Sequence, residues 1–237
     1  MTKRPFAISL TAAIAVLLLG GCTAGPTAGG DLSVAPTSSP SEAIELPSGV
    51  QGAVNFDEGY VQLGAGEKVV DLFIDPLCPY CKLFETASGP LLFDEVDSGR
   101  ATLRVYPLAV LNRLSLGTKY STRAAATFVA VAAGSPDQAR DFLVALYEHQ
   151  PAENTAGLTA EQLQELASSM GATVPADTLA QYEAWVDAET LDALNGPLPA
   201  TRETTAITQV PTVIVNGSVF HGDSNETAEF TAFYNRS

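Results

Sequence analysis

The sequence contains few positively charged residues. Its 237 residues include 12 lysines and arginines against 27 aspartates and glutamates, and the formal net charge is −15. Nucleic acid binds proteins through many Lys and Arg contacts to its phosphates, so this charge balance excludes nucleic acid as a partner. Apolar residues make up 46% of the chain, which is enough for a packed core. The composition therefore predicts a folded domain with an acidic surface.

Histidine and cysteine are scarce as well. The two histidines, His149 and His221, have no second candidate ligand at a metal-binding spacing. The chain also shows no internal repeat and no glycine-rich phosphate loop. We therefore predict neither a metal nor a cofactor. The chemistry has to be sought in the three cysteines, Cys22, Cys78 and Cys81.

A hydrophobic run long enough to span a membrane comfortably is also missing. The apolar run Ala7–Leu19 follows two basic residues and is short for a membrane span. It leads into Leu19-Gly20-Gly21-Cys22, which resembles a bacterial lipobox, where the chain is cut before the cysteine and the cysteine is acylated. The resemblance implies a lipoprotein signal peptide at residues 1–21 and a lipidated Cys22. The alternative is an ordinary secretory signal with an additional cysteine.

Residues 22–50 are predicted to be a lipid-anchored linker. From Thr23 to about Val50 the chain consists mainly of Gly, Pro, Ser, Thr and Ala without a usable hydrophobic period, which is typical of a flexible segment. About 28 such residues span on the order of 30 Å. The folded domain is then predicted at residues 51–237, on the extracytoplasmic side of the cell membrane, where disulfides persist.

The folded part begins with strand and helix patterns and continues with a long helical stretch. Strands are predicted at residues 69–74 and 102–108, with a helix between them from Tyr80 to about Ser88 that ends at Gly89-Pro90. Strand, helix and strand in this order predict a parallel crossover. A weaker strand pattern lies at residues 53–63. A helical insertion at about 118–195 is predicted to contain helices at residues 124–133, 136–149, 159–170 and 176–194.

The β pattern returns near the C-terminus. The apolar run Val210–Val215 is followed by Asn216-Gly217 and a second run, Ser218–His221. Asn-Gly between two apolar runs is a strong hairpin signal. A last helix from about Glu226 to Tyr234 is predicted to cover one face of the sheet.

The sequence Cys78-Pro79-Tyr80-Cys81 directly follows the first buried strand. Cysteines three residues apart on a first helical turn lie on one face and can form a disulfide. Closing so small a ring adds about 2 kcal/mol of stability, against about 4.7 kcal/mol for a hundred-residue loop, so redox chemistry explains the pair better. With Cys78 at the N-cap, its sulfur can accept a hydrogen bond from the Cys81 N–H and faces the positive end of the helix. We therefore expect Cys78 to be the nucleophile and Cys81 the buried resolving thiol.

This order of elements, with Cys-Pro-Tyr-Cys after one strand and Val210-Pro211-Thr212 before a later one, resembles the DsbA-like branch of the thioredoxin superfamily over about residues 51–237. The resemblance implies an α/β thioredoxin fold with a helical insertion between the second and third core strand segments. It also implies that Pro211 is cis and lies beside the disulfide, and that the Val210 backbone pairs with substrate. Pro79 and Tyr80 then belong to the redox motif.

Two positions depart from the pattern of this branch, and a third resembles it. Many relatives carry an acid six residues before the first cysteine, where this chain has Leu72; Asp71 is offset by one and is expected on the other side of the strand. Asp75 resembles an acid common in the branch, and a role in the turn before Pro76 is the alternative. Tyr80 stands where the most oxidising relatives have a histidine.

The resemblance implies an extracytoplasmic thiol:disulfide oxidoreductase that introduces disulfides into exported proteins through Cys78 and Cys81. Its expected partners are unfolded or reduced exported proteins and a quinone-linked membrane protein that recycles it. A reductase or isomerase of the same fold is the alternative within this chemistry, because the sequence does not set the direction of electron flow. A lipid-anchored binding or chaperone module with an inert disulfide is the alternative of a different class.

Overall fold

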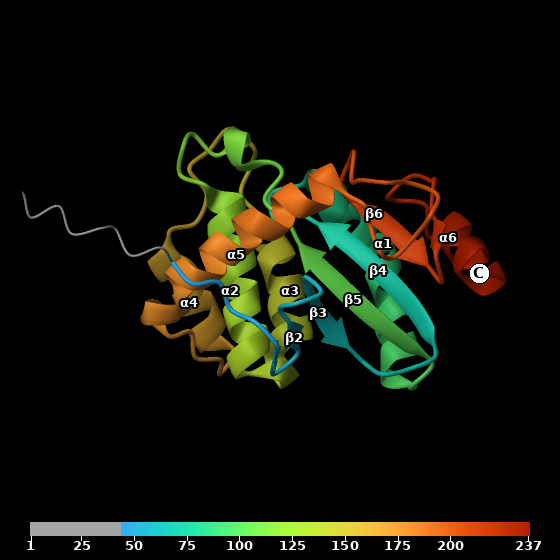
Figure 1. The fold of residues 1–237 in the computed structure, drawn as a ribbon, viewed down its shortest axis with the longest axis horizontal. Coiled ribbons are helices and arrows are strands. Elements are labelled where there is room, and N and C mark those ends of the chain that lie inside the picture. Colours follow the sequence, from blue (N-terminus) through green and yellow to red (C-terminus); the bar gives the residue numbers. More distant parts are fainter. Residues whose placement is uncertain (1–43) are drawn as a thin grey trace, which may run out of the picture. The chain divides into compact units, whose positions relative to one another are not determined.

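The computed structural model describes residues 44–237, which form a mixed β-sheet with helices packed against it (Figure 1). The sheet has the order β1-β2-β3-β5-β4-β6-β7, so that the two long strands, β4 and β5, are interior. The strands are β1 (Val50–Gln51), β2 (Val54–Asn55), β3 (Tyr60–Leu63), β4 (Lys68–Ile74), β5 (Ala101–Pro107), β6 (Thr212–Val215) and β7 (Ser218–Val219).

The centre of the sheet contains the predicted crossover. Strands β4 and β5 are parallel, with Leu72 beside Val105, and helix α1 (Pro79–Asp97) connects them. Strand β6 runs antiparallel to β4 on the other side, with Val213 beside Leu72. The predicted hairpin turn is confirmed: Asn216 and Gly217 have φ values of 49° and 88°, and a two-residue turn of type I′ needs positive φ at both positions.

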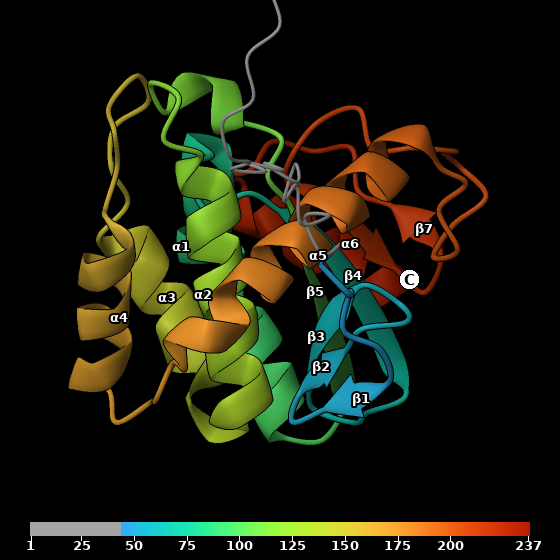
Figure 2. The same ribbon diagram turned by 60° about the vertical axis from the view of Figure 1, so that its left-hand side comes forward.

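The helical insertion lies between β5 and β6, as expected. Figure 2 shows α2, α3 and α4 side by side at the end of the domain away from β7. Helix α2 is buried along nearly its whole length, because its many alanines let neighbouring elements approach closely. Trp185 donates its indole N–H to the Phe56 carbonyl oxygen at 3.0 Å, which ties the insertion to the turn between β2 and β3. The helices are α2 (Tyr120–Gly134), α3 (Ala139–Glu148), α4 (Ala160–Ser169) and α5 (Ala176–Asn195).

Successive side chains of β4 point to opposite faces of the sheet. Val70, Leu72 and Ile74 belong to the main core, which also contains side chains of α1, α2 and the last helix, α6 (Thr227–Arg236). Phe73 points to the opposite face, where its ring stacks on Tyr106 with the ring centroids 4.1 Å apart. The side chain positions on β4 therefore decide which residues can lie beneath the first turn of α1.

The predicted end of the first helix at Gly89-Pro90 is wrong. Helix α1 continues through Pro90 to Asp97. Proline removes one backbone N–H and normally ends or kinks a helix, but Leu92 beyond it is only 1% exposed and belongs to the main core. Burial of the second half of the helix thus outweighs the local breaker. The weak strand pattern at 53–63 likewise resolves into two antiparallel strands, β2 and β3, rather than one.

The last residues of the predicted linker contact the domain. The Glu45 carbonyl oxygen accepts a hydrogen bond from the Gln181 side chain at 2.7 Å, and Gly49 N–H donates to the Asp57 carboxylate at 2.9 Å. The fold therefore begins several residues before position 51. The predicted signal peptide, Cys22 and the linker up to residue 43 lie outside the described residues.

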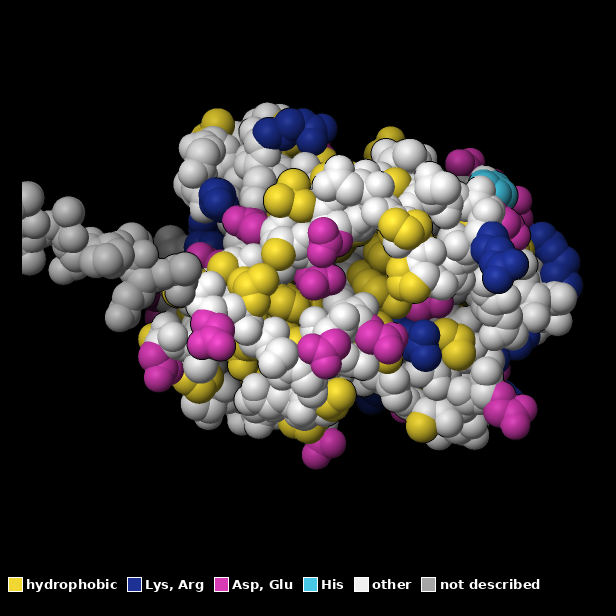
Figure 3. All heavy atoms as spheres, viewed as in Figure 1, with side chains coloured by type: hydrophobic (Ala, Val, Ile, Leu, Met, Phe, Trp, Pro, Cys, Tyr) yellow, Lys and Arg dark blue, Asp and Glu magenta, His cyan; other side chains and the backbone are white. Residues whose placement is uncertain are grey.

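Acidic side chains are spread over the face of the domain that Figure 3 shows, around a hollow with apolar walls. Phe73, Tyr106 and Leu108 line a cavity of about 420 Å³, together with Glu189 and Asp192. Burial raises the pKa of Glu189 to about 7, and the charge of Asp192 adds to the shift. No helix within residues 44–237 has the length and apolar character to cross a membrane.

Candidate active site

The two thiols lie where β4 ends and α1 begins. Cys78 has extended backbone angles and occupies the N-cap of α1, and Pro79 is the first helical residue, a position where the missing N–H of proline costs nothing. Cys81 follows in the first turn. Cys78 and Cys81 are 3% and 1% exposed, and both are free thiols.

With its thiol protonated, the Cys78 sulfur makes no cap hydrogen bond to the helix, so the expected bond from the Cys81 N–H is not formed in the neutral thiol, although this N–H lies near enough to lower the pKa of Cys78. That N–H donates to the Cys78 carbonyl oxygen at 3.1 Å instead. The Cys78 thiol donates to the Val210 carbonyl oxygen at 3.3 Å. The physical reason is that a neutral thiol has a proton to donate and is only a weak acceptor.

The two thiols differ in acidity. The pKa of Cys78 lies below its ordinary value, chiefly because the Cys81 thiol donates a hydrogen bond to its sulfur; burial opposes this, and the nearby N–H groups of Cys81 and Tyr80 assist it. The pKa of Cys81 lies well above its ordinary value, chiefly because the side chain is buried. A thiolate therefore forms on Cys78 before it forms on Cys81.

Asp75 is a buried acid directly before the redox motif. It is 0% exposed, and its two carboxylate oxygens accept the N–H groups of Leu77 and Leu111, each at 2.8 Å. Burial raises its pKa to about 6, although these hydrogen bonds oppose the shift. The hydrogen bond from the Leu77 N–H gives Asp75 the role in the turn at Pro76 that was the alternative from the sequence. The hydrogen bond from the Leu111 N–H joins this turn to the segment after β5.

The strand beneath Cys81 carries Leu72, not an acid. Leu72 and Cys81 line the same small apolar space in the main core, and Tyr147 of α3 lines it too. Asp71 points to the opposite face, as predicted, where it accepts a hydrogen bond from the Tyr106 hydroxyl at 3.1 Å. A carboxylate on β4 is thus kept away from the resolving thiol by the two-residue period of the strand.

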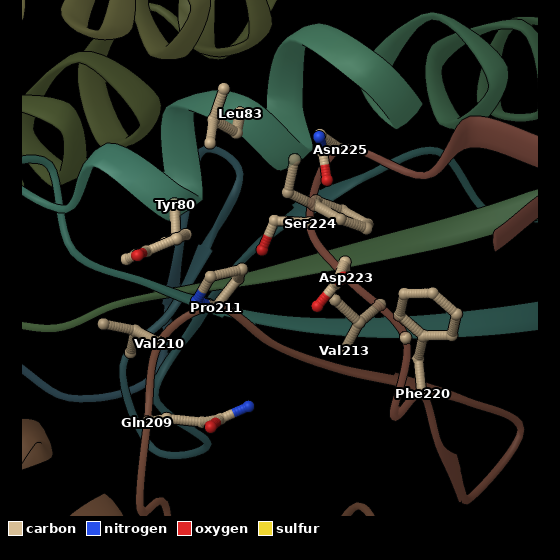
Figure 4. A pocket seen from close by; sticks show the side chains of 12 residues that line it. Tyr80, Leu83, Gln209, Val210, Pro211, Val213, Phe220, Asp223, Ser224 and Asn225 are labelled. Carbon is tan, nitrogen blue, oxygen red and sulfur yellow. The ribbon is translucent and has the colours of Figure 1, made fainter. Parts of the chain in front are cut away.

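A groove runs along the site between α1 and the segments that flank β6 and β7. The Val210–Pro211 peptide bond is cis, as the resemblance implies. Figure 4 shows Tyr80 and Leu83 projecting from α1 opposite Val210 and Pro211, with the loop before α6 closing the far end. The groove has a volume of about 530 Å³, and its lining also includes Phe84, Gln209, Val213, Phe220 and residues 222–225. Tyr80 and Leu83, at 64% and 45% exposed, form an apolar rim on which a polypeptide segment can bind.

The structure adds residues to the site that the sequence analysis missed. Gln150, which follows α3, donates its side-chain amide to the carbonyl oxygens of Pro76 and Cys78 at 2.9 Å and 3.0 Å. The Tyr147 hydroxyl lies 3.5 Å from the Asp75 carbonyl oxygen. These residues are about 70 positions away from the thiols along the chain, and no motif connects the two segments. His149, one of the two histidines without a second ligand at metal-binding spacing, is the C-cap of α3.

Comparisons with known proteins identify the family of this fold. A family model described as thioredoxin matches residues 64–233. A serine/threonine-protein kinase, PknE of Mycobacterium tuberculosis, is 28% identical over 144 residues, which are 59% of this chain and 25% of the kinase. The chain thus spans about a quarter of the length of the curated relative that it matches.

Two solved structures from Mycobacterium tuberculosis are similar over most of their length. The reduced disulfide bond oxidoreductase DsbG has a TM-score of 0.59 and 27% identity, covering 75% of this chain and 86% of DsbG. Oxidised DsbA has a TM-score of 0.60 and 28% identity, covering 75% of this chain and 91% of DsbA. The chain belongs to the thioredoxin family, and its fold is that of the DsbA-like thiol:disulfide oxidoreductases.

Proposed function

We propose that this protein introduces disulfides into exported proteins, outside the cytoplasm, by exchange at Cys78 and Cys81. The observation that carries the proposal is the difference between the two thiols. Cys78 has a lowered pKa and lies against Val210 at the groove, whereas Cys81 is buried with a raised pKa. Cys78 is therefore the sulfur that exchanges with clients, and Cys81 is the resolving thiol.

The oxidation proceeds in two exchange steps. A client thiolate attacks the Cys78 sulfur of the oxidised protein, the bond between Cys78 and Cys81 breaks, and Cys81 leaves and takes up a proton. A second client thiolate then attacks the client sulfur of the mixed disulfide, and Cys78 leaves as a thiolate. The client loses two electrons to the cysteine pair. A lowered pKa makes Cys78 the better leaving group, which favours this direction.

The groove provides a place for the client segment that carries the cysteine. The Val210 carbonyl oxygen accepts the Cys78 thiol in the reduced protein, but an oxidised Cys78 has no proton to donate. In the oxidised protein this carbonyl oxygen is therefore free to accept a backbone N–H of the client. Extended peptides form such main-chain hydrogen bonds when they pair with the backbone of a protein. The exposed rings and aliphatic side chains of Tyr80 and Leu83 add apolar contact.

The direction of electron flow is tested by comparing the oxidised and reduced forms of the full chain with Cys22→Ser. In this variant Cys78 and Cys81 are the only cysteines. A stabilised Cys78 thiolate favours the dithiol, so we expect the reduced form to unfold at higher denaturant concentration at neutral pH. A preference of about 1.4 kcal/mol raises the potential by about 30 mV, and we expect a value between about −270 mV and about −120 mV in a glutathione titration.

A chain in which Cys78 and Cys81 are also serine is the control, because its stability must not respond to the redox buffer. A more stable oxidised form, with a potential at or below about −270 mV, would contradict the oxidase and favour the reductase or isomerase. An inert disulfide that does not exchange with glutathione would favour the binding module.

The proposal also places the protein on the extracytoplasmic side of the cell membrane, anchored through Cys22. A fatty acid label is expected to tag the wild-type chain and to be lost in Cys22→Ser. Release of unlabelled wild-type protein into the medium would count against the anchor. The anchor would hold the domain near a quinone-linked membrane protein, the proposed acceptor of the two electrons that each client delivers.

A further inference from the structure

The helical insertion reaches the redox motif through the end of α3. Gln150 is half-buried there, and one amide nitrogen, Nε2, lies 2.9 Å from the Pro76 carbonyl oxygen and 3.0 Å from that of Cys78. Tyr147, one turn earlier, points its hydroxyl at the Asp75 carbonyl oxygen. Three carbonyls of the turn that precedes α1 thus face side chains from the insertion.

The turn needs these partners because it is neither strand nor helix. Within residues 44–237, no backbone N–H donates to the Pro76 carbonyl oxygen, so the Gln150 amide is its protein donor. The Cys78 carbonyl oxygen already accepts the N–H groups of Cys81 and Lys82, and the amide adds a third donor. A buried carbonyl without a donor is costly, and each of these bonds restricts the backbone that carries the Cys78 sulfur.

We propose that Gln150 is a positioning residue for thiol–disulfide exchange, holding Cys78 against Val210 by binding the Pro76 and Cys78 carbonyls with one amide group. This rests on the proposed function only in taking Cys78 as the exchanging sulfur. The amide also turns its positive N–H groups toward the Cys78 backbone, so its charge distribution favours a thiolate on that residue. The insertion accordingly supports the redox motif directly, in addition to covering the sheet.

The test substitutes Gln150 in the full chain with Cys22→Ser and measures two quantities that need no client protein. These are the rate of Cys78 alkylation at neutral pH and the potential in a glutathione titration. Gln150→Leu keeps a side chain of similar size without the donors, and we expect alkylation to slow by about fivefold, which is the equivalent of one hydrogen bond. We expect the potential to fall with it, because the dithiol form is less favoured.

Two further variants separate positioning from a general loss of stability. Gln150→Lys places a positive donor at the same point and should alkylate at least as fast as the wild type. Gln150→Glu places a negative charge there and should alkylate more slowly than Gln150→Leu. Asp75 and Lys82 are unchanged in every variant, so the order of rates reports the group at position 150. Gln138→Leu, before α3, is the matched control, since the Gln138 side chain makes no cap hydrogen bond to this helix.

The proposal is supported if reactivity and potential follow the order Lys, Gln, Leu, Glu while Gln138→Leu equals the wild type. It is overturned if folded Gln150→Leu has the wild-type rate and potential. It is equally overturned if all three variants slow alkylation in proportion to their loss of stability, irrespective of charge. A wild-type chain that exchanges with glutathione but does not oxidise clients would remove the proposed function and leave this test intact.

Discussion

Replacing Cys78 with alanine is expected to abolish client oxidation, and replacing Cys81 with alanine is expected to accumulate mixed disulfides with exported proteins. Without Cys78 no sulfur remains at the groove, and loss of the reacting atom lowers a rate on the order of a thousandfold or more. In Cys81→Ala the Cys78 thiolate can still exchange with a disulfide of a client, from which a client thiolate leaves. The Cys81 thiol that would attack this mixed disulfide and release Cys78 is missing, so Cys78 stays bonded to the client. Both results are read on non-reducing gels after expression in an exporting host.

The third cysteine provides the matched control. Cys22→Ser removes a thiol that is not part of the redox motif, and we expect it to leave client oxidation in solution unchanged. The assigned roles are reversed if only Cys78→Ala traps clients. Equal trapping by both variants would mean that either sulfur can be attacked, which the opposite pKa directions of the two thiols do not support.

Asp75→Asn is expected to change how stability depends on pH. The pKa of Asp75 is raised from 3.8 to about 6 in the folded chain by burial, so the folded protein binds this proton more tightly than the unfolded chain does. The resulting stabilisation is complete below about pH 4 and is lost as the pH rises through about 6. At about 1.4 kcal/mol per pKa unit, the loss amounts to about 3 kcal/mol.

Asparagine carries no charge at any of these pH values. The free energy of unfolding of the wild type should therefore fall by about 3 kcal/mol relative to Asp75→Asn between pH 4 and pH 7. Urea unfolding over this range measures the difference, and groups common to both chains, such as Glu189, cancel. Asp137→Asn, at an exposed position, controls for the loss of one negative charge. A difference that stays constant with pH, or that grows in favour of the wild type, would contradict the raised pKa.

The same variant bears on the thiols. The negative charge of Asp75 raises the pKa of Cys78 and of Cys81. Removing it should therefore make Cys78 alkylate faster at a given pH. Since the Asp75 carboxylate also holds the N–H groups of Leu77 and Leu111, the stability profile and the alkylation rate together separate its charge from its hydrogen bonds.

Local patterns were sufficient for most of the elements that carry the site. The β-branched and aromatic residues of β4 predict a buried strand, and Cys78-Pro79 predicts the start of α1, because proline fits a first helical turn. Thr159 and Gln162 form a capping box at the start of α4, a pattern that is visible in the sequence. In each case the stabilising contact lies within a few residues along the chain, so the sequence contains the whole interaction.

Local patterns failed where a distant contact outweighs a local preference. Pro90 indicates a helix end, yet α1 continues because Leu92 is buried in the core. The Cys78 sulfur was expected to accept the Cys81 N–H, yet it donates to Val210, 132 positions away. Neither partner can be identified from its neighbours in sequence, since each contact exists only once the sheet has formed.

The sequence by itself thus determined the strand, the helix start and the i, i+3 spacing of the two thiols, because these follow from short-range geometry. The choice of Leu72 over Asp71 beneath Cys81 was also contained in it, through the two-residue period of a strand. The tertiary structure alone decided which groups surround the thiols: the Val210 carbonyl, the Leu111 N–H that shares Asp75, and the Gln150 amide. These groups come from segments separated by tens of residues, and they meet at the redox motif only because the insertion and β6 pack against the central strands.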